Sequence, residues 1–151
     1  MKFWDSSALV PLLVAETSTK RLSALYRREP EIAAWWGTEV ECASAVGRLE
    51  RDGGLAPHDV DQALRRLDAL RDRWQEIQPV ADVKMTARRF LRVHPLRAAD
   101  ALQLAAAFVA SERRPFTLQF VSLDDRLNAA ARREGFVTQA TGKPPDRGGD
   151  P

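Results

Sequence analysis

The chain has 151 residues, 44% of them hydrophobic, which is enough for one globular domain with its own core. Its 23 lysines and arginines against 21 acidic residues leave a net charge of only +2, so overall charge by itself does not attract nucleic acid. The single cysteine excludes an internal disulfide framework, and with two histidines it cannot form a closed Cys/His zinc site. This cysteine usage predicts a reduced, cytoplasmic protein. The strand-like start MKFWDSS and the lack of a long apolar run predict no signal peptide and no membrane span.

Apolar periodicity and turn residues predict alternating strands and helices along the chain. In chain order we expect a strand over 2–4, helices over 8–15 and 18–28, a strand over 32–36, helices from Thr38 and from Pro57, an extended piece around Ile77, helices over 81–92 and 98–110, a strand over 118–123, a helix over 126–133 and an edge strand over 136–138. This order predicts an α/β domain over residues 1–140 with a mostly parallel sheet. The Pro/Gly-rich residues 141–151 are expected to form a disordered tail.

The first strand ends at Asp5, which is followed by Ser6 and Ser7 before an apolar helix. Both residue types, aspartate and serine, cap helices, so Asp5 or Ser6 has a structural explanation as the cap. The carboxyl end of a strand in an open α/β sheet is also where sites form, because loops and helix N-termini converge there. Both interpretations of Asp5 are open at this point.

The helix that begins at Thr38 carries a second acidic residue, Glu41, in its first turn. Thr38 and Glu41 match a capping box, in which the glutamate binds the backbone N–H of the cap residue. The alternative is that Glu41 lies at the same sheet edge as Asp5 and points toward it. Cys42 beside it is expected to be a buried apolar residue and not a nucleophile.

Two more acidic residues stand at helix starts in the second half of the chain. Asp100 lies in the first turn of LRAADALQLAAAFVA, a helix that is apolar on nearly every side and is therefore expected to be buried. Asp124 follows the strand over 118–123, where Ser122 and Asp125 match a capping pair. Capping explains each acid singly, but Ser, Thr or Asn would cap as well, so the choice of an acid at all four points is unexplained.

Because such points share one edge of a parallel sheet, Asp5, Glu41, Asp100 and Asp124 can converge although the chain separates them widely. Clustered carboxylates repel one another and raise one another's pKa, so a site of this kind implies a bound cation. A ligand set made only of oxygens suits Mg²⁺ or Mn²⁺ better than zinc.

Four segments, in order, resemble the acidic motifs of PIN-domain ribonucleases, especially the VapC toxins of bacterial toxin–antitoxin pairs. These segments are KFWDSSALV, TEVECASAVGRLERDG, LRAADALQLAAA and FVSLDDRL. The resemblance covers roughly residues 1–140, and LRAADALQLA is its most specific part. It implies a three-layer α/β/α fold with a central, mostly parallel sheet of four to five short strands.

The resemblance also implies a function, a Mg²⁺- or Mn²⁺-dependent endoribonuclease that acts as the toxin of a type II pair. Asp5, Glu41, Asp100 and Asp124 would be its catalytic and metal-binding residues. Ser7, Arg97 and Ser122 would contact the substrate, with Arg97 near the phosphate. The expected partners are RNA, a cognate antitoxin and a second copy of the chain.

Some features leave alternatives open. Glu39 and Asp125 could replace Glu41 and Asp124, although the residues that follow Glu41 and Asp124 fit the family's offsets better. Trp4 is bulkier than the residue that often precedes the first aspartate, and is expected to narrow the mouth of the site. The rival functions are a non-catalytic binding module of the same fold and a Mg²⁺-dependent phosphatase. The phosphatase would normally need a second aspartate where Ser7 stands.

Overall fold

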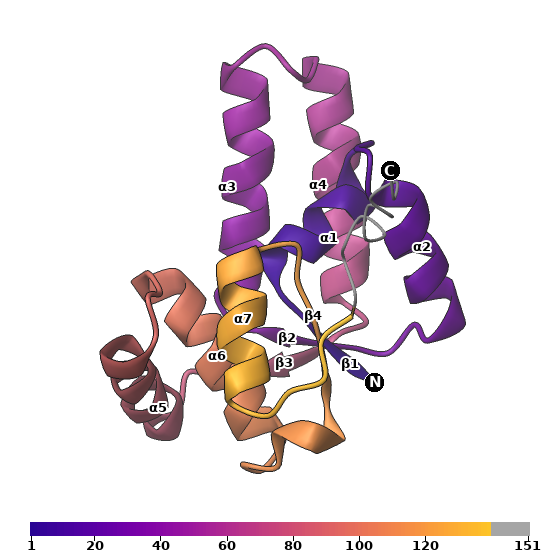
Figure 1. Cartoon of the computed structure of the whole chain (residues 1–151). Coiled ribbons are helices and arrows are strands. Elements are labelled where there is room, and N and C mark those ends of the chain that lie inside the picture. The colour runs from indigo at the N-terminus through magenta and orange to yellow at the C-terminus, as the bar shows by residue number, and fades with distance from the viewer. Residues whose placement is uncertain (140–151) are drawn as a thin grey trace, which may run out of the picture.

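A computed structural model describes residues 1–139 and shows a four-stranded sheet with helices on both faces (Figure 1). In chain order the elements are β1 (Lys2–Trp4), α1 (Ser6–Leu13), α2 (Thr19–Arg28), β2 (Ile32–Trp35), α3 (Thr38–Arg51), α4 (Pro57–Arg71), β3 (Gln75–Ile77), α5 (Ala81–Val93), α6 (Ala98–Ala110), a 3-10 turn (Pro115–Thr117), β4 (Gln119–Val121) and α7 (Asp125–Arg133). The predicted α/β class and parallel sheet are confirmed. The predicted tail, 141–151, and the predicted domain end at residue 140 lie outside the described residues.

The sheet has the strand order β3-β2-β1-β4, and each neighbouring pair is parallel. In the central register, Lys2 of β1 pairs with Ile32 of β2 on one side and with Gln119 of β4 on the other. The chain therefore leaves β1 toward one side of the sheet and later returns to its other side. Loops diverge at such a switch point and leave a crevice at the carboxyl ends of the strands.

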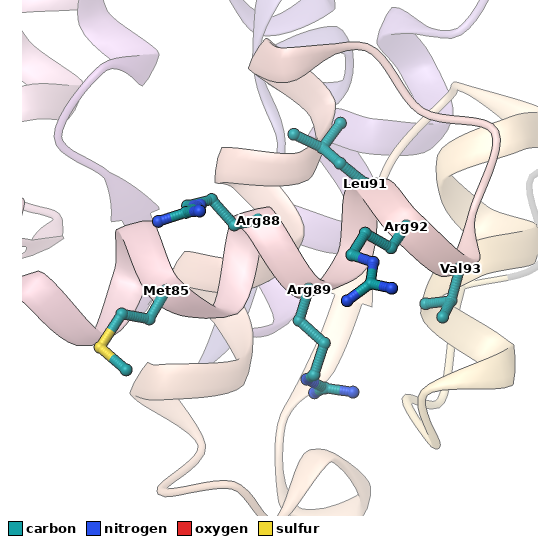
Figure 2. Close-up of a pocket in the computed structure, with 6 residues that line it drawn as sticks. All are labelled: Met85, Arg88, Arg89, Leu91, Arg92 and Val93. Carbon is teal, nitrogen blue, oxygen red and sulfur yellow. The ribbon is translucent and has the colours of Figure 1, made fainter.

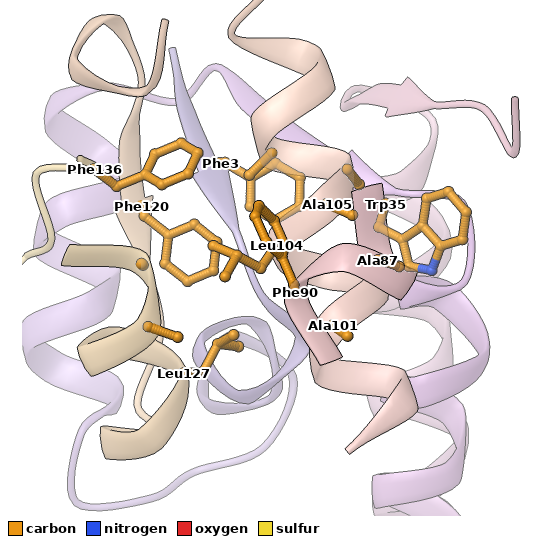
Figure 3. Close-up of a cluster of buried hydrophobic side chains, with 14 of the residues drawn as sticks. Phe3, Trp35, Ala87, Phe90, Ala101, Leu104, Ala105, Phe120, Leu127 and Phe136 are labelled. Carbon is orange, nitrogen blue, oxygen red and sulfur yellow. The ribbon is translucent and has the colours of Figure 1, made fainter. Parts of the chain in front are cut away.

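Successive residues of a strand contribute side chains alternately to two hydrophobic cores, one on each face of the sheet. Phe3 packs with α5, α6 and α7, whereas its neighbour Trp4 packs with α1 to α4. Figure 3 shows the first of these cores, in which the stacked rings of Phe3 and Phe120 have centroids 5.5 Å apart. This alternation follows from the two-residue period of a strand, and it produces the three layers that the resemblance implied.

Helix α6 lies in the middle of the first core, as its apolar sequence predicted. Ala101, Ala105, Ala106 and Ala107 are buried, and their small side chains allow close packing of α6 against α5 and β2. The start of α6, which carries Asp100, is consequently fixed relative to the sheet.

Several predicted details differ from the structure. The expected strand over 136–138 is reduced to a single bridge between Thr138 and Phe120, and the strand over 118–123 spans only Gln119–Val121. Trp4 does not narrow the mouth of a site, because its side chain is fully buried under α1 to α4. Within residues 1–139 we find no helix with the length and hydropathy needed to cross a bilayer.

Candidate active site

The four acidic residues singled out by the sequence line one hollow of about 480 Å³ at the carboxyl ends of the strands. Asp5 follows β1 and Asp124 follows β4, while Glu41 and Asp100 lie in the first turns of α3 and α6. We call this the carboxylate hollow. Its rim includes Ser44 and Arg48 of α3. Residues nearly 120 positions apart in the sequence are therefore neighbours in space.

Asp5 is the most buried of the four, with 3% of its surface exposed. Its Oδ2 atom accepts hydrogen bonds from the hydroxyls of Ser7 at 2.5 Å and Ser122 at 2.9 Å. The backbone N–H of Leu123 in turn donates to the Ser7 hydroxyl. Burial raises the pKa of Asp5, and the hydrogen bonds from the two serines act in the opposite direction. The hydroxyls thus tie the turn after β1 to the turn after β4 and hold Asp5 in place.

This network changes the expected role of Ser122. Its side chain is completely buried and donates to Asp5, while its oxygen accepts from the backbone N–H of Asp124. A side chain without exposed surface cannot contact RNA directly, so Ser122 supports Asp5 instead of binding substrate. Ser7 is partly exposed in the carboxylate hollow, but its hydroxyl also donates to Asp5.

Glu41 is held by a residue that the sequence analysis did not single out, Gln103 of α6. The Gln103 amide donates to Glu41 Oε2 at 2.7 Å and to the Thr38 hydroxyl at 2.9 Å. Burial raises the pKa of Glu41 to about 7, the charges of Asp5 and Asp100 contribute, and the hydrogen bonds from Gln103 and Ser6 oppose the rise. The expected capping box is absent from α3, because Gly37 is the cap residue there and Thr38 already lies inside the helix.

A sequence signal for Gln103 does exist. It is the one long polar side chain within an otherwise apolar stretch of α6, one turn after Asp100 and completely buried. A buried amide needs a hydrogen-bonding partner, so its position on the same face as Asp100 indicates a polar neighbour.

Asp100 and Asp124 form the border of the carboxylate hollow. Burial raises the pKa of Asp100, the charge of Asp124 raises it further, and the backbone N–H and guanidinium of Arg97 lower it. Asp124 caps α7, since its Oδ1 accepts from the backbone N–H of Leu127 at 2.9 Å. Asp124 therefore caps a helix and lines the carboxylate hollow at the same time. Asp5 does the same, because it caps α1.

A second hollow of about 650 Å³ adjoins the first and shares Asp100 and Asp124 with it. Its other charged residues are Arg97, Asp125 and Arg126. We call it the arginine hollow. Arg97, expected near the phosphate of a substrate, thus lies beside Asp100 and outside the carboxylate hollow.

Glu39 and Asp125, the alternatives to Glu41 and Asp124, do not line the carboxylate hollow. Glu39 points away from the carboxylate hollow and pairs with Arg71 of α4 at 3.0 Å. Asp125 is exposed and lines only the arginine hollow. Their positions favour Glu41 and Asp124 as members of the acidic quartet.

The side chains in the hollow suit a hard divalent cation by type, because they offer carboxylate and hydroxyl oxygens. Their present arrangement is more open than a formed metal site: within residues 1–139, no three Asp, Glu, His or Cys side chains lie close enough together to hold one ion. Asp5 and Asp124 also use carboxylate oxygens in hydrogen bonds within the fold. An ion bound by all four residues would require rotation of these side chains.

A hollow along α5 lacks this chemistry (Figure 2). It combines three arginines with Met85, Leu91 and Val93, and contains no carboxylate. Cys42 is not a candidate nucleophile, because it is buried and burial raises the pKa of its thiol to about 12. Among the described residues, the acid-lined hollow at the sheet edge is therefore the candidate active site.

Comparison with known proteins identifies the family. No family model matches the chain, but Ribonuclease VapC47 of Mycobacterium tuberculosis (strain CDC 1551 / Oshkosh) is 32% identical over 147 residues, which cover 94% of this chain and 98% of the relative. The chain belongs to the VapC ribonuclease family.

Solved structures agree with this membership at the level of the fold. M. tuberculosis VapC20, described as a Sarcin-Ricin loop cleaving toxin, superimposes with a TM-score of 0.63 at 20% identity, covering 91% of this chain and 97% of VapC20. FitAcB from Neisseria gonorrhoeae gives a TM-score of 0.62 at 18% identity, covering 91% and 96% of the two chains. The predicted PIN-domain, VapC-type resemblance is confirmed.

Proposed function

We propose that this VapC-family chain is a metal-dependent endoribonuclease and the toxin of a type II toxin–antitoxin pair. The observation that supports this proposal most strongly is the gathering of Asp5, Glu41, Asp100 and Asp124 around one hollow. Their electrostatic coupling supports it as well, since Asp100 contributes to the raised pKa of both Asp5 and Glu41. Like charges held this close are stable together when a cation or protons neutralise them.

In the proposed reaction each residue has a separate task. Mg²⁺ or Mn²⁺, held by Asp5, Asp100, Asp124 and Glu41, would acidify a water and neutralise charge on the phosphate oxygens. Glu41, which would complete the metal shell directly or through a water, would help to accept the proton of the attacking water. Ser7 and Ser122 hold Asp5 in position through their hydroxyls. Arg97, beside Asp100, would contact a phosphate of the bound RNA.

The test compares the parent chain with Asp100→Asn on single-stranded RNA, with Mg²⁺, with Mn²⁺ and with EDTA. Losing a hydrogen-bond partner of a metal ligand costs about 10- to 100-fold in activity, so losing a ligand should cost at least about 100-fold. Glu39→Gln is the matched control, because it removes one carboxylate of α3 that lies outside the hollow. The proposal predicts that Glu39→Gln stays active, that Asp100→Asn does not, and that Asp100→Asn folds as stably as the parent. Equal cleavage by Asp100→Asn and the parent would refute it.

Assays of the parent chain on two substrates separate the two rival functions. A phosphatase would release phosphate from a phosphomonoester such as p-nitrophenyl phosphate and leave internal RNA linkages intact. A binding module would bind RNA and cleave neither substrate. We expect cleavage of internal RNA linkages alone.

The proposed partners follow from the acidic hollow and from the family. A pocket lined by carboxylates is complementary to a basic peptide, so a cognate antitoxin would insert an arginine or lysine there and block the site. Co-expression with the product of a neighbouring upstream reading frame should suppress RNA cleavage and toxicity. We further propose that the chain acts in the cytoplasm as a homodimer, which light scattering would show as twice the chain mass.

A further inference from the structure

Two adjoining hollows meet at the same pair of aspartates, and they differ in charge. The carboxylate hollow contains Asp5, Glu41 and Arg48 in addition to the shared Asp100 and Asp124. The arginine hollow contains neither Asp5 nor Glu41, and its lining adds Arg97, Arg126 and Asp125 to the shared pair. Both volumes lie within the range of about 300–1,000 Å³ that is usual for ligand sites.

The two arginines come from different elements and reach the same hollow. Arg97 precedes the first turn of α6, and Arg126 lies in the first turn of α7. Both side chains are exposed, and within residues 1–139 neither guanidinium forms a salt bridge or hydrogen bond with another side chain. Arg97 interacts with the charge of Asp100 but forms no salt bridge with it. A guanidinium without such a bond is available to an anionic ligand, and its planar donors match phosphate oxygens.

We propose that the arginine hollow binds the phosphate of RNA next to the scissile one, with Arg97 and Arg126 as its ligands. The inference rests on the proposed function, because it takes the scissile phosphate to lie over the four carboxylates. A single strand would then pass from one hollow to the other across Asp100 and Asp124. Arg97 and Arg126 position the strand, and neither takes part in bond cleavage.

Exposed arginines also lie on α5, away from both hollows. Figure 2 shows that Arg88 and Arg89 point to opposite sides of the helix, so they do not converge on one ligand. Arg89 also lies over the Phe90 ring, 4.7 Å from its centroid. None of the residues that line this surface lines either acidic hollow. Arg88→Ala is therefore a matched control that removes one exposed positive charge from a helix elsewhere.

The experiment measures binding of a fluorescent single-stranded RNA to Asp100→Asn protein in Mg²⁺, with cleavage by the parent chain assayed alongside. Adding Arg97→Ala or Arg126→Ala should weaken binding by about tenfold. Each should also reduce the slope of log affinity against log salt by about 0.7, the value for one phosphate contact on a single strand. Arg126→Lys should restore much of the affinity, and Arg88→Ala should change neither quantity.

A neutral methylphosphonate placed at one linkage locates the contact. At the linkage on one side of the cleavage site it should weaken binding by a similar factor, and Arg97→Ala/Arg126→Ala should abolish that sensitivity. Unchanged binding by both arginine variants, or an equal loss in Arg88→Ala, would overturn the inference even if the parent chain cleaves RNA. Failure of the parent chain to cleave RNA with either metal would instead overturn the proposed function, while the binding results would still decide the role of the two arginines.

Discussion

Single residues decide the charge state of the candidate site. Asp5, Glu41 and Asp100 all have raised pKa values, and in each case burial is the largest cause. The hydroxyls of Ser7 and Ser122 and the amide of Gln103 act against this rise by donating to the ionised forms. Burial and hydrogen bonding therefore act in opposite directions on the charge of this metal-free pocket.

This balance predicts an unusual dependence of stability on pH. An unfolded glutamate loses its proton near pH 4.5, whereas folded Glu41 keeps it to about pH 7. Between these values the folded state binds more protons, so the free energy of unfolding of the metal-free protein should fall as pH rises through this window. Urea unfolding in EDTA at pH 5 and pH 7.5 measures the effect. Glu41→Gln should show a smaller decrease, and an identical pH dependence would contradict the assignment.

Gln103 provides a second prediction for a single residue. Gln103→Leu removes a buried hydrogen bond to the Thr38 hydroxyl and a partly buried one to the Glu41 carboxylate. We expect a loss of about 1–3 kcal/mol in stability and a further rise in the pKa of Glu41, visible by NMR titration of its carboxyl carbon. Gln78→Leu removes an exposed bond of the same type, from Gln78 to Glu76, and should change neither property. A pKa of Glu41 that does not move in Gln103→Leu would show that the amide does not control it.

At the level of secondary structure, two of the four acids serve a helix and the site at once. Asp5 caps α1 and Asp124 caps α7, each through a side-chain oxygen that accepts a backbone N–H. An N-cap is satisfied by serine, threonine or asparagine as well as by aspartate, so the helices alone do not require a charge. The negative charge at these positions is consequently attributable to the proposed function.

Substitutions at Asp124 can separate these two tasks. Asp124→Asn keeps a good cap and removes the charge, so its stability should match the parent or exceed it, while RNA cleavage is lost. Asp124→Ala removes both, and should lose cleavage together with about 1 kcal/mol of stability. Thermal unfolding and an RNA-cleavage assay on the two variants give the comparison. Retained cleavage in Asp124→Asn would show that the cap is the residue's only contribution.

At the level of the whole molecule, the parallel sheet creates the site. The strand order β3-β2-β1-β4 brings the ends of β1 and β4 together, and the backbone N–H of Asp5 donates to the carbonyl of Val121 at 2.9 Å. Helices α3 and α6 then present their first turns to the same edge. The site therefore exists only in the folded state.

Because unfolding disperses the ligands, a divalent cation should stabilise the whole domain. By mass action, Mn²⁺ or Mg²⁺ at 100 times its dissociation constant should raise the free energy of unfolding by about 2.7 kcal/mol. Thermal unfolding with increasing metal concentration measures this rise, and EDTA should reverse it. Asp5→Asn/Asp100→Asn protein should show little shift, whereas Asp59→Asn/Asp61→Asn, which neutralises two acids of α4 outside both hollows, should respond like the parent. Equal shifts in both double variants would place the ion elsewhere.

The sequence by itself determined the element order, the central place of α6 and the four acids at helix starts. Each of these follows from local rules of apolar period, capping and turn chemistry, which act over a few residues. The strand over 136–138 and the capping box at Thr38 were wrong because local pattern cannot show whether a partner strand or a competing side chain is present. Trp4 was misplaced for the same reason, since only packing shows which face of the sheet a residue joins.

The tertiary structure decided how these parts combine. It paired Glu41 with Gln103, turned Glu39 toward Arg71, buried Ser122 behind Asp5, and split the acidic edge into two hollows that share Asp100 and Asp124. The three side-chain contacts join residues at least 32 positions apart in the sequence. The two hollows together combine four segments of the chain. Such contacts depend on how helices pack on the sheet. The sequence therefore specified which carboxylates are available, and the packing of α3, α6 and α7 around β1 determined what surrounds them.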